Sequence, residues 1–487
     1  MCTSAKNSYA PRRSRWCLAF PAVLGACTVG PDFRPPVPPV AQAYNYGGDP
    51  QVAIATGGVS QTVDPAANLP AAWWALFRAP ALDAMVREAA KNNPSIEAAQ
   101  AALRAAEFEL RAGHGIFYPA IEGRFSAARE RAPAVATGEA GQGRMFSLLT
   151  LGTTVSYALD VFGGDRRLVE ALGAAADLQR EEMRATALAV AANVVNTAIA
   201  RAAYEAERAV TVEIAANLKD QAHLSRVRAE AGTGSYAAAL ALESQLASIE
   251  ATLPVLQQKI DQATDLLATL VGTSPAAWMP PALDLSMIEL PPTLPLSMPS
   301  ALVRQRPDIR AAEASLHAAN AAIGVATAAM FPSVTLDAAY SANGGGANAL
   351  FAGGGAGWKL GTDVAFPLFE GGMLWFKRKA AIASYERTAA IYRQTVLSAF
   401  QQVADTLKAL EHDAAASAAE ARAMTTAAAA QHLTAVDYDA GLVSYDELLI
   451  ANATRLQAHL AYVQVTATRL QDCVALFVAL GGGWWAG

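Results

Sequence analysis

The chain has 487 residues, and 37 Lys and Arg stand against 43 Asp and Glu, which gives a formal net charge of −6. This balance leaves no basic excess for binding nucleic acid. Beyond the N-terminal leader we find no stretch of about 18 apolar residues, so we expect no membrane-spanning helix in the mature chain. Spanning β-strands, which need only about ten alternating residues each, stay compatible with the sequence.

The first 26 residues have the pattern of a secretory signal peptide, with arginines at 12–15 followed by an apolar run at 16–23. The run ends in Leu24-Gly25-Ala26-Cys27, which resembles a bacterial lipobox, so we expect Cys27 to be the lipidated first residue of the mature chain. Residues 27–72 are then a lipid-anchored extended segment, rich in proline at its start. The alternative is an ordinary leader with an incidental cysteine.

The remaining chain contains a tandem duplication. Pro94 and Pro119 are 25 residues apart (119 − 94), and Pro307 and Pro332 have the same spacing (332 − 307), with matching apolar positions between them. We therefore expect a first repeat at 73–274, a proline-rich connector at 275–299, a second repeat at 300–482 and a short tail at 483–487.

Each repeat begins with a helix that starts at a proline, at 94–116 and 307–329. Two segments with a period of two residues follow in each repeat, which predicts two β-strands per repeat. One face of these strands is apolar and the other carries charge, which is typical of strands that separate lipid from water. Four strands are too few to close a barrel, so we expect several copies of the chain to pool them.

A very long, proline-free segment comes next in each repeat, at 163–231 and 371–440. Its composition favours helix throughout, and about 65 helical residues would be about 100 Å long. Each helix is predicted to turn at a glycine, Gly232 or Gly441, and to return as a second helix over 235–271 or 444–480. A strict heptad stripe with charge pairs, as in an ordinary coiled coil, is missing.

These features resemble one family, the TolC-like bacterial outer-membrane efflux proteins, and within it the lipoprotein branch typified by OprM and NodT-type proteins. The matching stretches cover the mature chain in the family's order: CTVGPDFRPP (27–36), WWALFRAPALDAMVREAAKNNP (73–94), LDVFGGDRR (159–167), RQRPDIRAAEASL (304–316), FPLFEGG (366–372), YDAGLVSYDELL (438–449) and ALGGGW (479–484).

The resemblance implies an α+β membrane protein that forms a homotrimer. Three copies would close a 12-stranded β-barrel in the outer membrane, and their long helical hairpins would form an α-barrel through the periplasm. It also implies a palmitoylated lipoprotein that contacts outer-membrane lipid and works with a periplasmic adaptor and an inner-membrane RND-type transporter. The expected function is the passive exit duct of a tripartite efflux pump for small molecules such as drugs.

Two alternatives stay open at this stage. One is a duct for type I protein secretion within the same fold, and the other is a lipid-anchored structural coiled-coil protein. We expect no enzyme, no cofactor and no metal site, because the six histidines lack i, i+4 pairing and no clustered nucleophile or phosphate loop is present.

By its resemblance to the family, the chain has candidate site residues in three places. A pore gate at the end of the second hairpin would use Tyr438, Glu447, Asp446, Asp437 and Asp439, although Val443, Ile450 and Ala238 replace charged residues of TolC. Adaptor contacts are expected at the turns, at Gly232, Thr233, Gly441 and Leu442. Charged strand residues are expected to face the barrel lumen: Glu122, Arg124, Asp337, Lys359 and Asp363.

Overall fold

A computed structural model describes residues 28–37, 43–49, 52–53, 61–64, 67, 69–133 and 144–484. Cys27 and the leader lie outside the described residues. The chain divides into two compact units, and each unit takes residues from both repeats. Unit 1 consists of the chain up to Pro35 with Ala106–Ala176 and Ser315–Ala389, and unit 2 consists of Pro36–Ala105, Asp177–Ala314 and Ala390–Gly487.

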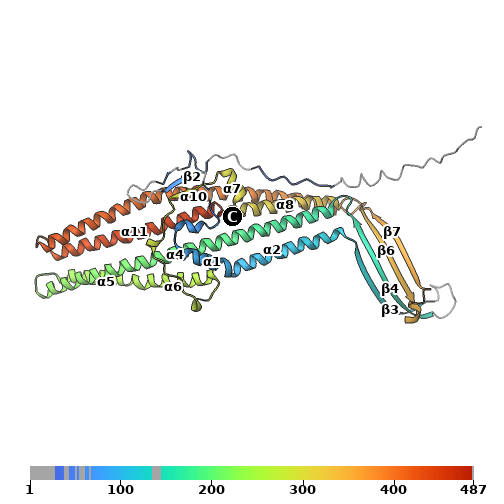
Figure 1. Cartoon of the computed structure of the whole chain (residues 1–487), viewed down its shortest axis with the longest axis horizontal. Helices are drawn as coiled ribbons and strands as arrows, with labels where there is room; N and C mark the ends of the chain where they lie inside the picture. The colour runs from blue at the N-terminus through green and yellow to red at the C-terminus, as the bar shows by residue number, and fades with distance from the viewer. Residues whose placement is uncertain are drawn as a thin grey trace, which may run out of the picture. The chain divides into compact units, whose positions relative to one another are not determined.

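Unit 1 contains a four-stranded antiparallel sheet in the order β3-β4-β6-β7 (Figure 1). Its strands are β3 (Ala120–Ala132), β4 (Arg144–Leu159), β6 (Ser333–Gly344) and β7 (Ala356–Ala365), and helix α9 (Ala347–Leu350) lies in the β6–β7 connection. The two strands predicted for each repeat are confirmed. Strands β3 and β7 form the edges of this sheet, so each has one ladder of backbone groups without a strand partner in the described chain.

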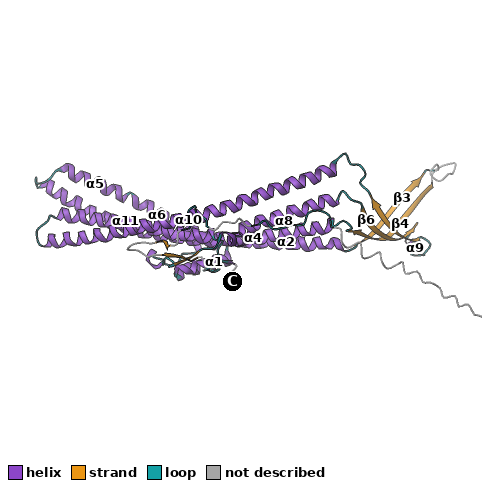
Figure 2. Ribbon diagram, turned by 90° about the horizontal axis from the view of Figure 1, so that it is seen from above, coloured by secondary structure: helices purple, strands orange, loops and turns teal. Residues whose placement is uncertain are grey.

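Helices make up most of the described chain (Figure 2). Helix α1 (Pro80–Asn92) leads into α2 (Pro94–Gly113), and α7 (Pro299–Gln305) leads into the equivalent α8 (Pro307–Ala328). The two long helices are α4 (Gly164–Glu230) and α10 (Met373–Asp439), each with 67 residues, or about 100 Å at 1.5 Å per residue. The lengths and positions predicted from the duplication are therefore confirmed.

The returning helices differ between the repeats. In the second repeat α11 (Tyr445–Ala479) is continuous, but in the first repeat the return is split into α5 (Tyr236–Glu250) and α6 (Thr252–Val271). The prediction of one helix over 235–271 is wrong in this respect. Pro254 explains the split, because a proline lacks the N–H that would bond four residues back, to the carbonyl of Glu250, where α5 ends.

A small three-stranded sheet in unit 2 was not predicted. It has the order β1-β2-β5, from β1 (Val52–Ala53), β2 (Gln61–Asp64) and β5 (Thr293–Pro295), and β2 pairs with β5 in parallel. The N-terminal segment is therefore not simply extended, since β2 is paired with the proline-rich connector. That connector also holds two short 3₁₀ helices, Pro275–Ala277 and Leu285–Met287.

The main apolar core lies in unit 2. Trp73 and Phe77, from the 3₁₀ helix Trp73–Phe77, pack with their ring centroids 5.8 and 6.0 Å from that of Phe477 on α11. All three side chains are at most 1% exposed. Val194, Val195 and Ile199 of α4 belong to the same core, so α4 buries this stretch against the rest of unit 2.

By length and composition, α4 also contains an 18-residue window apolar enough to cross a membrane, with mean hydropathy 1.2 and 39% of the window buried. We expected no membrane-spanning helix in the mature chain. Judged by length and composition alone, that expectation is wrong for α4. The alanine-rich sequence that raises the hydropathy also supplies buried side chains to the core of unit 2.

We expect Phe477→Ala to lower the free energy of unfolding by about 3–5 kcal/mol, because the truncated side chain leaves a cavity that the two neighbouring rings fill only in part. Circular dichroism during denaturation measures the change. Phe351→Ala is the matched control, since Phe351 is 78% exposed. Equal losses in both variants would contradict the assignment of Phe477 to the core.

Candidate functional site

All five strand residues predicted to face a lumen lie on one face of the four-stranded sheet. Residues that oppose each other across a ladder share a face. Glu122 opposes Thr154, which opposes Ala339, which opposes Lys359, and Asp337 and Asp363 fall in equivalent rows. Arg124 opposes Gly152 on the same face. The sheet therefore has one charged face.

The opposite face is apolar and exposed. It carries Ile121, Phe125, Leu151, Leu336, Tyr340, Trp358, Leu360 and Val364. Trp358 and Leu360 are 80% and 75% exposed. A contiguous exposed apolar surface of this kind marks an interaction with lipid or protein.

The two hairpin turns have the same backbone geometry. In each, the turn glycine is left-handed, with φ +73° at both Gly232 and Gly441. The next residue, Thr233 or Leu442, donates its N–H back to the carbonyl of Arg228 or Asp437. This is a Schellman cap, which satisfies the last carbonyls of the long helix. Apart from the two chain neighbours of each glycine, no heavy atom of the described chain lies within 4 Å of a Cβ built there, so a side chain would meet open space at both turns.

Glu447 has a structural partner in its own turn. The N–H of Ser444 donates to Glu447 Oε2 at 2.8 Å, and the N–H of Glu447 donates to Ser444 Oγ at 3.3 Å, which completes a capping box at the start of α11. Ser235 begins α5 without a side-chain cap bond, and Ala238, which stands where Glu447 stands in the second repeat, has no carboxylate to complete a capping box.

Asp446 forms an ion pair with Arg228, so the end of α4 is tied to the start of α11. Sequence reasoning missed Arg228. The duplication contained a signal for it. Arg228 lies four residues before Gly232 (232 − 228), and the gate candidate Asp437 lies four residues before Gly441 (441 − 437), so the two residues occupy equivalent positions. A second ion pair, Arg226 with Glu243, joins α4 to α5 near the same end.

The other gate candidates lie at this end of unit 2 without forming one cluster within the chain. Tyr438 is 39% exposed and its ring lies 5.5 Å from that of Tyr445. Asp437 is half-buried and Asp439 is exposed, and neither carboxylate is bonded to another residue of the described chain. They are therefore available to other copies of the chain or to solvent.

The described N-terminal segment, 28–37, is held on unit 1 near the β4–α4 junction. The N–H of Val29 donates to the carbonyl of Phe162 at 3.0 Å. Arg167 Nη2 donates to Asp32 at 2.6 Å, and Arg167 Nη1 donates to Glu170 at 2.7 Å. We call these contacts of Val29 and Asp32 the N-terminal clamp.

The second repeat completes this clamp. His317 of α8 lies 2.8 Å from Glu170 Oε1, and its ring stacks on Phe33 with centroids 4.3 Å apart. A Cβ at Gly163 would lie 2.6 Å from the Thr28 side chain, and one at Gly30, where φ is +97°, would lie 2.5 Å from Gly324. The first described residues are thus fixed by both repeats, one residue after Cys27.

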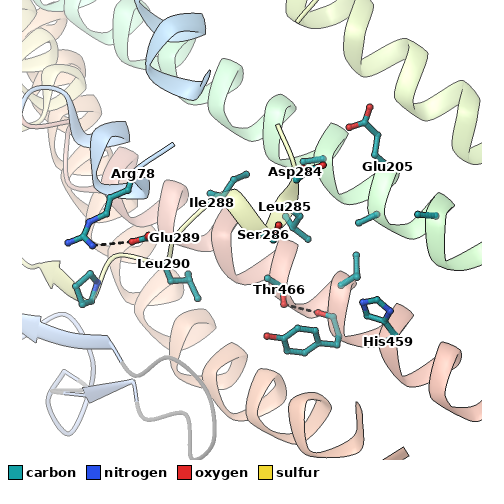
Figure 3. Close-up of a pocket in the computed structure, with 16 residues that line it drawn as sticks. Arg78, Glu205, Asp284, Leu285, Ser286, Ile288, Glu289, Leu290, His459 and Thr466 are labelled. Carbon is teal, nitrogen blue, oxygen red and sulfur yellow. Dashed lines mark hydrogen bonds and ion pairs between the residues drawn. The ribbon is translucent and has the colours of Figure 1, made fainter. Parts of the chain in front are cut away.

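A groove of about 840 Å³ lies in unit 2 between α4 and α11, beside the proline-rich connector (Figure 3). Alanines of α4 and Val463 line its walls. Arg78 and Glu289 point toward each other and form an ion pair of 3.1 Å, and Glu205 pairs with Arg201 at 2.7 Å. His459 lies on the α11 side of the groove. The Arg78–Glu289 pair thus joins two residues that line the groove, and the partner of Glu205 lies on α4 itself.

Among the described residues, no three His, Cys, Asp or Glu side chains lie where they could share a metal ion. The one free cysteine in this part of the chain, Cys473, is fully buried, and burial raises the pKa of its thiol to about 11. A thiol with such a pKa is a poor nucleophile at neutral pH.

The family model described as "Outer membrane efflux protein" matches residues 85–273 and 298–482. The chain belongs to this family. The match contains both repeats, including the sheet and both hairpins, so the resemblance noted in the sequence is confirmed. As a member of the outer membrane efflux proteins, the chain is assigned to the outer membrane.

Curated relatives extend over nearly the whole chain. The toluene efflux pump outer membrane protein TtgC of Pseudomonas putida is 29% identical over 465 residues, which are 95% of this chain and 94% of the relative. The pyoverdine export outer membrane protein OpmQ of Pseudomonas aeruginosa is 29% identical over 423 residues, which are 85% of this chain and 87% of the relative.

Solved structures agree with this fold. The outer-membrane channel OprN has a TM-score of 0.81 at 27% identity and covers 94% of this chain and 100% of its own. The Campylobacter jejuni CmeC outer membrane channel has a TM-score of 0.83 at 20% identity, over 94% of this chain and 95% of its own, and at that identity the likeness concerns the fold alone.

We expect Arg167→Gln to release the N-terminal clamp, because it removes the ion pair to Asp32 and leaves Glu170 without its arginine partner. The protection of the Val29 amide should fall about tenfold, as the loss of about 1–2 kcal/mol implies. Hydrogen–deuterium exchange of the peptide that contains Val29 measures this. Arg180→Gln, which breaks an arginine–aspartate pair within α4, is the control. If both variants lowered the protection of the Val29 amide equally, this would argue against the clamp.

Proposed function

We propose that this outer membrane efflux protein is the passive exit duct of a tripartite pump, through which small molecules leave the cell. The observation that carries the proposal is the four-stranded sheet of unit 1. It has one charged face, one exposed apolar face and two edges without a strand partner in the described chain. A sheet of this kind is suited to separate water from lipid once its edges are paired.

Symmetry supplies the missing partners in this proposal. In a homotrimer, β3 of one copy pairs with β7 of the next, and three four-stranded sheets close a 12-stranded β-barrel. The charged residues on the inner face then line a water-filled lumen. The 67-residue helices and their returns form the periplasmic α-barrel of the same assembly.

The membrane anchor and the partners are further parts of the proposal. Cys27 carries the acyl chains, and the N-terminal clamp fixes the chain directly after it. The open turns at Gly232–Thr233 and Gly441–Leu442 receive a periplasmic adaptor, which connects the duct to an inner-membrane RND-type transporter. The names of the relatives, which refer to efflux pumps and to pyoverdine export, support this assignment.

The gate is proposed at the ends of the hairpins. The Arg228–Asp446 ion pair holds α11 against α4 and so favours a narrow periplasmic end. Asp437 and Asp439 are the candidates for contacts between copies, and Tyr438 packs beside the turn. Glu447, which we expected in the gate, is used for the capping box, so its part in gating is indirect.

Neither alternative function has an observation in its favour. The relatives are named for efflux or export of small molecules rather than for protein secretion. A structural coiled-coil protein would not need a sheet with a charged face and an exposed apolar face.

The sheet offers a matched test of the barrel. Leu360→Arg places a charge on the apolar face, at a cost of about 2–4 kcal/mol if that face contacts lipid. Gly361→Arg places the same charge on the other face, opposite Asp337. We expect the first variant to lose heat-resistant trimers in outer-membrane extracts, and the second to assemble with reduced cation selectivity in planar bilayers. Loss of assembly in both, or in neither, would contradict the proposed orientation.

The variants Arg228→Ala and Asp446→Ala test the gate. Each variant breaks the ion pair between α4 and α11, so each should increase the fraction of channels whose periplasmic end is open. Because the two side chains are 38% and 46% exposed, the pair contributes about 0.2–1 kcal/mol and the increase is up to about fivefold. Planar-bilayer conductance measures it, and the exchanged pair Arg228→Asp with Asp446→Arg should restore the wild-type value.

Glu447→Gln serves as the control for this series. Glutamine keeps the capping box but removes the charge, so this variant should conduct as the wild type does. A conductance change in Glu447→Gln would show that the charge of Glu447 contributes directly to the gate. Unchanged conductance in both Arg228→Ala and Asp446→Ala would show that the Arg228–Asp446 pair has no part in the gate.

A further inference from the structure

The exposed apolar face of the sheet continues beyond the end of strand β7. On β7, Leu360 and Val364 lie on that face, and Phe366, one residue after the strand, follows the same alternation and is exposed. Leu368 and Phe369 come next and are 92% and 88% exposed. The first residues of α10 add three more exposed apolar side chains: Met373, Trp375 and Phe376. We call residues 366–379 the entry segment of α10.

The aromatic side chains of the entry segment are held in place by a tight turn. Gly371 and Gly372 are both left-handed, with φ +61° and +83°. The N–H of Phe376 donates to the carbonyl of Gly372 at 3.0 Å, and a Cβ on Gly372 would lie 3.4 Å from the Phe376 ring. The rings of Trp375 and Phe376 then meet edge to face, with centroids 4.8 Å apart. The aromatic pair is thus fixed on the surface.

Three consecutive cations follow these rings. Among the described residues, none of Lys377, Arg378 and Lys379 forms an ion pair with a carboxylate. Arg378 Nε donates to Thr327 Oγ1 of α8 at 3.2 Å, and Lys379 Nζ lies 5.2 Å from the centroid of the Trp375 ring. The entry segment contains one acid, Glu370, so its net charge is +2 (3 − 1) in a chain with a net charge of −6. Adjacent like charges repel, so an anion bound beside them is favoured.

The duplication shows that a helix start of this kind has an alternative. In the first repeat, Asp165–Arg167 follows Gly164, and its two arginines are bonded to aspartates within unit 1. At the equivalent place in the second repeat, Met373–Trp375 follows Gly372. The first long helix therefore begins with charges that are paired inside the chain. The second begins with exposed apolar side chains, followed by cations that have no carboxylate partner in the described chain.

We propose that the entry segment of α10 binds an anionic phospholipid. Lys377 and Lys379 contact the phosphate, while Trp375 and Phe376 lie at the boundary between headgroups and acyl chains. Aromatic and basic side chains side by side are typical of the membrane interface, where the ring is partly apolar and the cation meets lipid phosphate. The proposal rests on the proposed barrel, because the apolar face of β7 must contact lipid.

Charge and continuity favour this occupant. A free phosphate would satisfy the cations but would leave the exposed surface around Phe369 and Phe376 in water. An uncharged lipid would cover the apolar surface but would leave the segment's net positive charge without a counterion. An anionic phospholipid covers both, and the apolar face of the sheet, which is proposed to contact lipid, leads directly into the entry segment.

Lipid binding to the full-length, detergent-solubilised protein provides the first test. Native mass spectrometry with added phosphatidylglycerol or phosphatidylcholine measures both affinities. The wild type should prefer phosphatidylglycerol. Lys377→Gln and Lys379→Gln should each weaken its binding about fivefold, and the double variant about thirtyfold, without changing the binding of phosphatidylcholine. Lys219→Gln, at an exposed position of α4, is the matched control and should bind as the wild type does.

Three outcomes of this experiment would overturn the proposal. They are equal affinities of the wild type for the two lipids, equal weakening by Lys219→Gln, and complete displacement of phosphatidylglycerol by an equal concentration of inorganic phosphate. Heat-resistant trimers are scored in the same samples. Trimers without a preference for phosphatidylglycerol would refute the lipid site and leave the barrel standing, whereas a wild type without trimers would refute the barrel and the lipid site with it.

Tryptophan fluorescence provides the second test and distinguishes lipid from a second copy of the chain. The protein is placed in phosphatidylglycerol vesicles with or without bromine atoms on the acyl chains. The emission that Trp375→Phe removes should be quenched by the bromines. The emission removed by Trp278→Phe, the control, should not be quenched, because Trp278 lies in the connector and donates to Glu88. An unquenched Trp375 would show that another protein surface covers it and would overturn the proposal.

Discussion

The two edges of the four-stranded sheet, which have no strand partner among the described residues, are the constraint on which the remaining architecture depends. A strand edge exposes a row of backbone donors and acceptors, and here it adjoins an apolar face with Trp358 and Leu360 largely exposed. Neither surface is compatible with an isolated monomer in water. In the proposed trimer, the strands of neighbouring copies cover both edges, which agrees with membership of the outer membrane efflux family.

Duplication gave the chain two similar hairpins that have since diverged. Both long helices have the same length and end in the same left-handed glycine. Yet Pro254 splits the first return into α5 and α6, and Ala238 deprives α5 of the capping box that Glu447 gives α11. The second hairpin is thus the more regular one, and it also contains the buried Arg469.

Short-range sequence patterns correctly predicted the features that depend on local backbone geometry. Alternation placed Glu122, Lys359 and Asp363 on one face because side chains of a strand alternate regardless of the tertiary fold. The hairpin turns followed from Gly232 and Gly441 for a similar reason. Contacts between distant segments were missed. The Arg228–Asp446 pair, the parallel pairing of β2 with β5 and the hydrogen bonds from Arg469 to Gln61 each join residues more than 200 positions apart. Nothing in a short stretch of sequence records them.

The crossing of Gly30 over Gly324 has a practical consequence for protein engineering. No side chain fits between the two backbones, so a leader taken from a different protein is best joined before Thr28, with everything from Thr28 to Phe33 left native. A reporter or purification tag spliced into that stretch would compete with α8 for the same space.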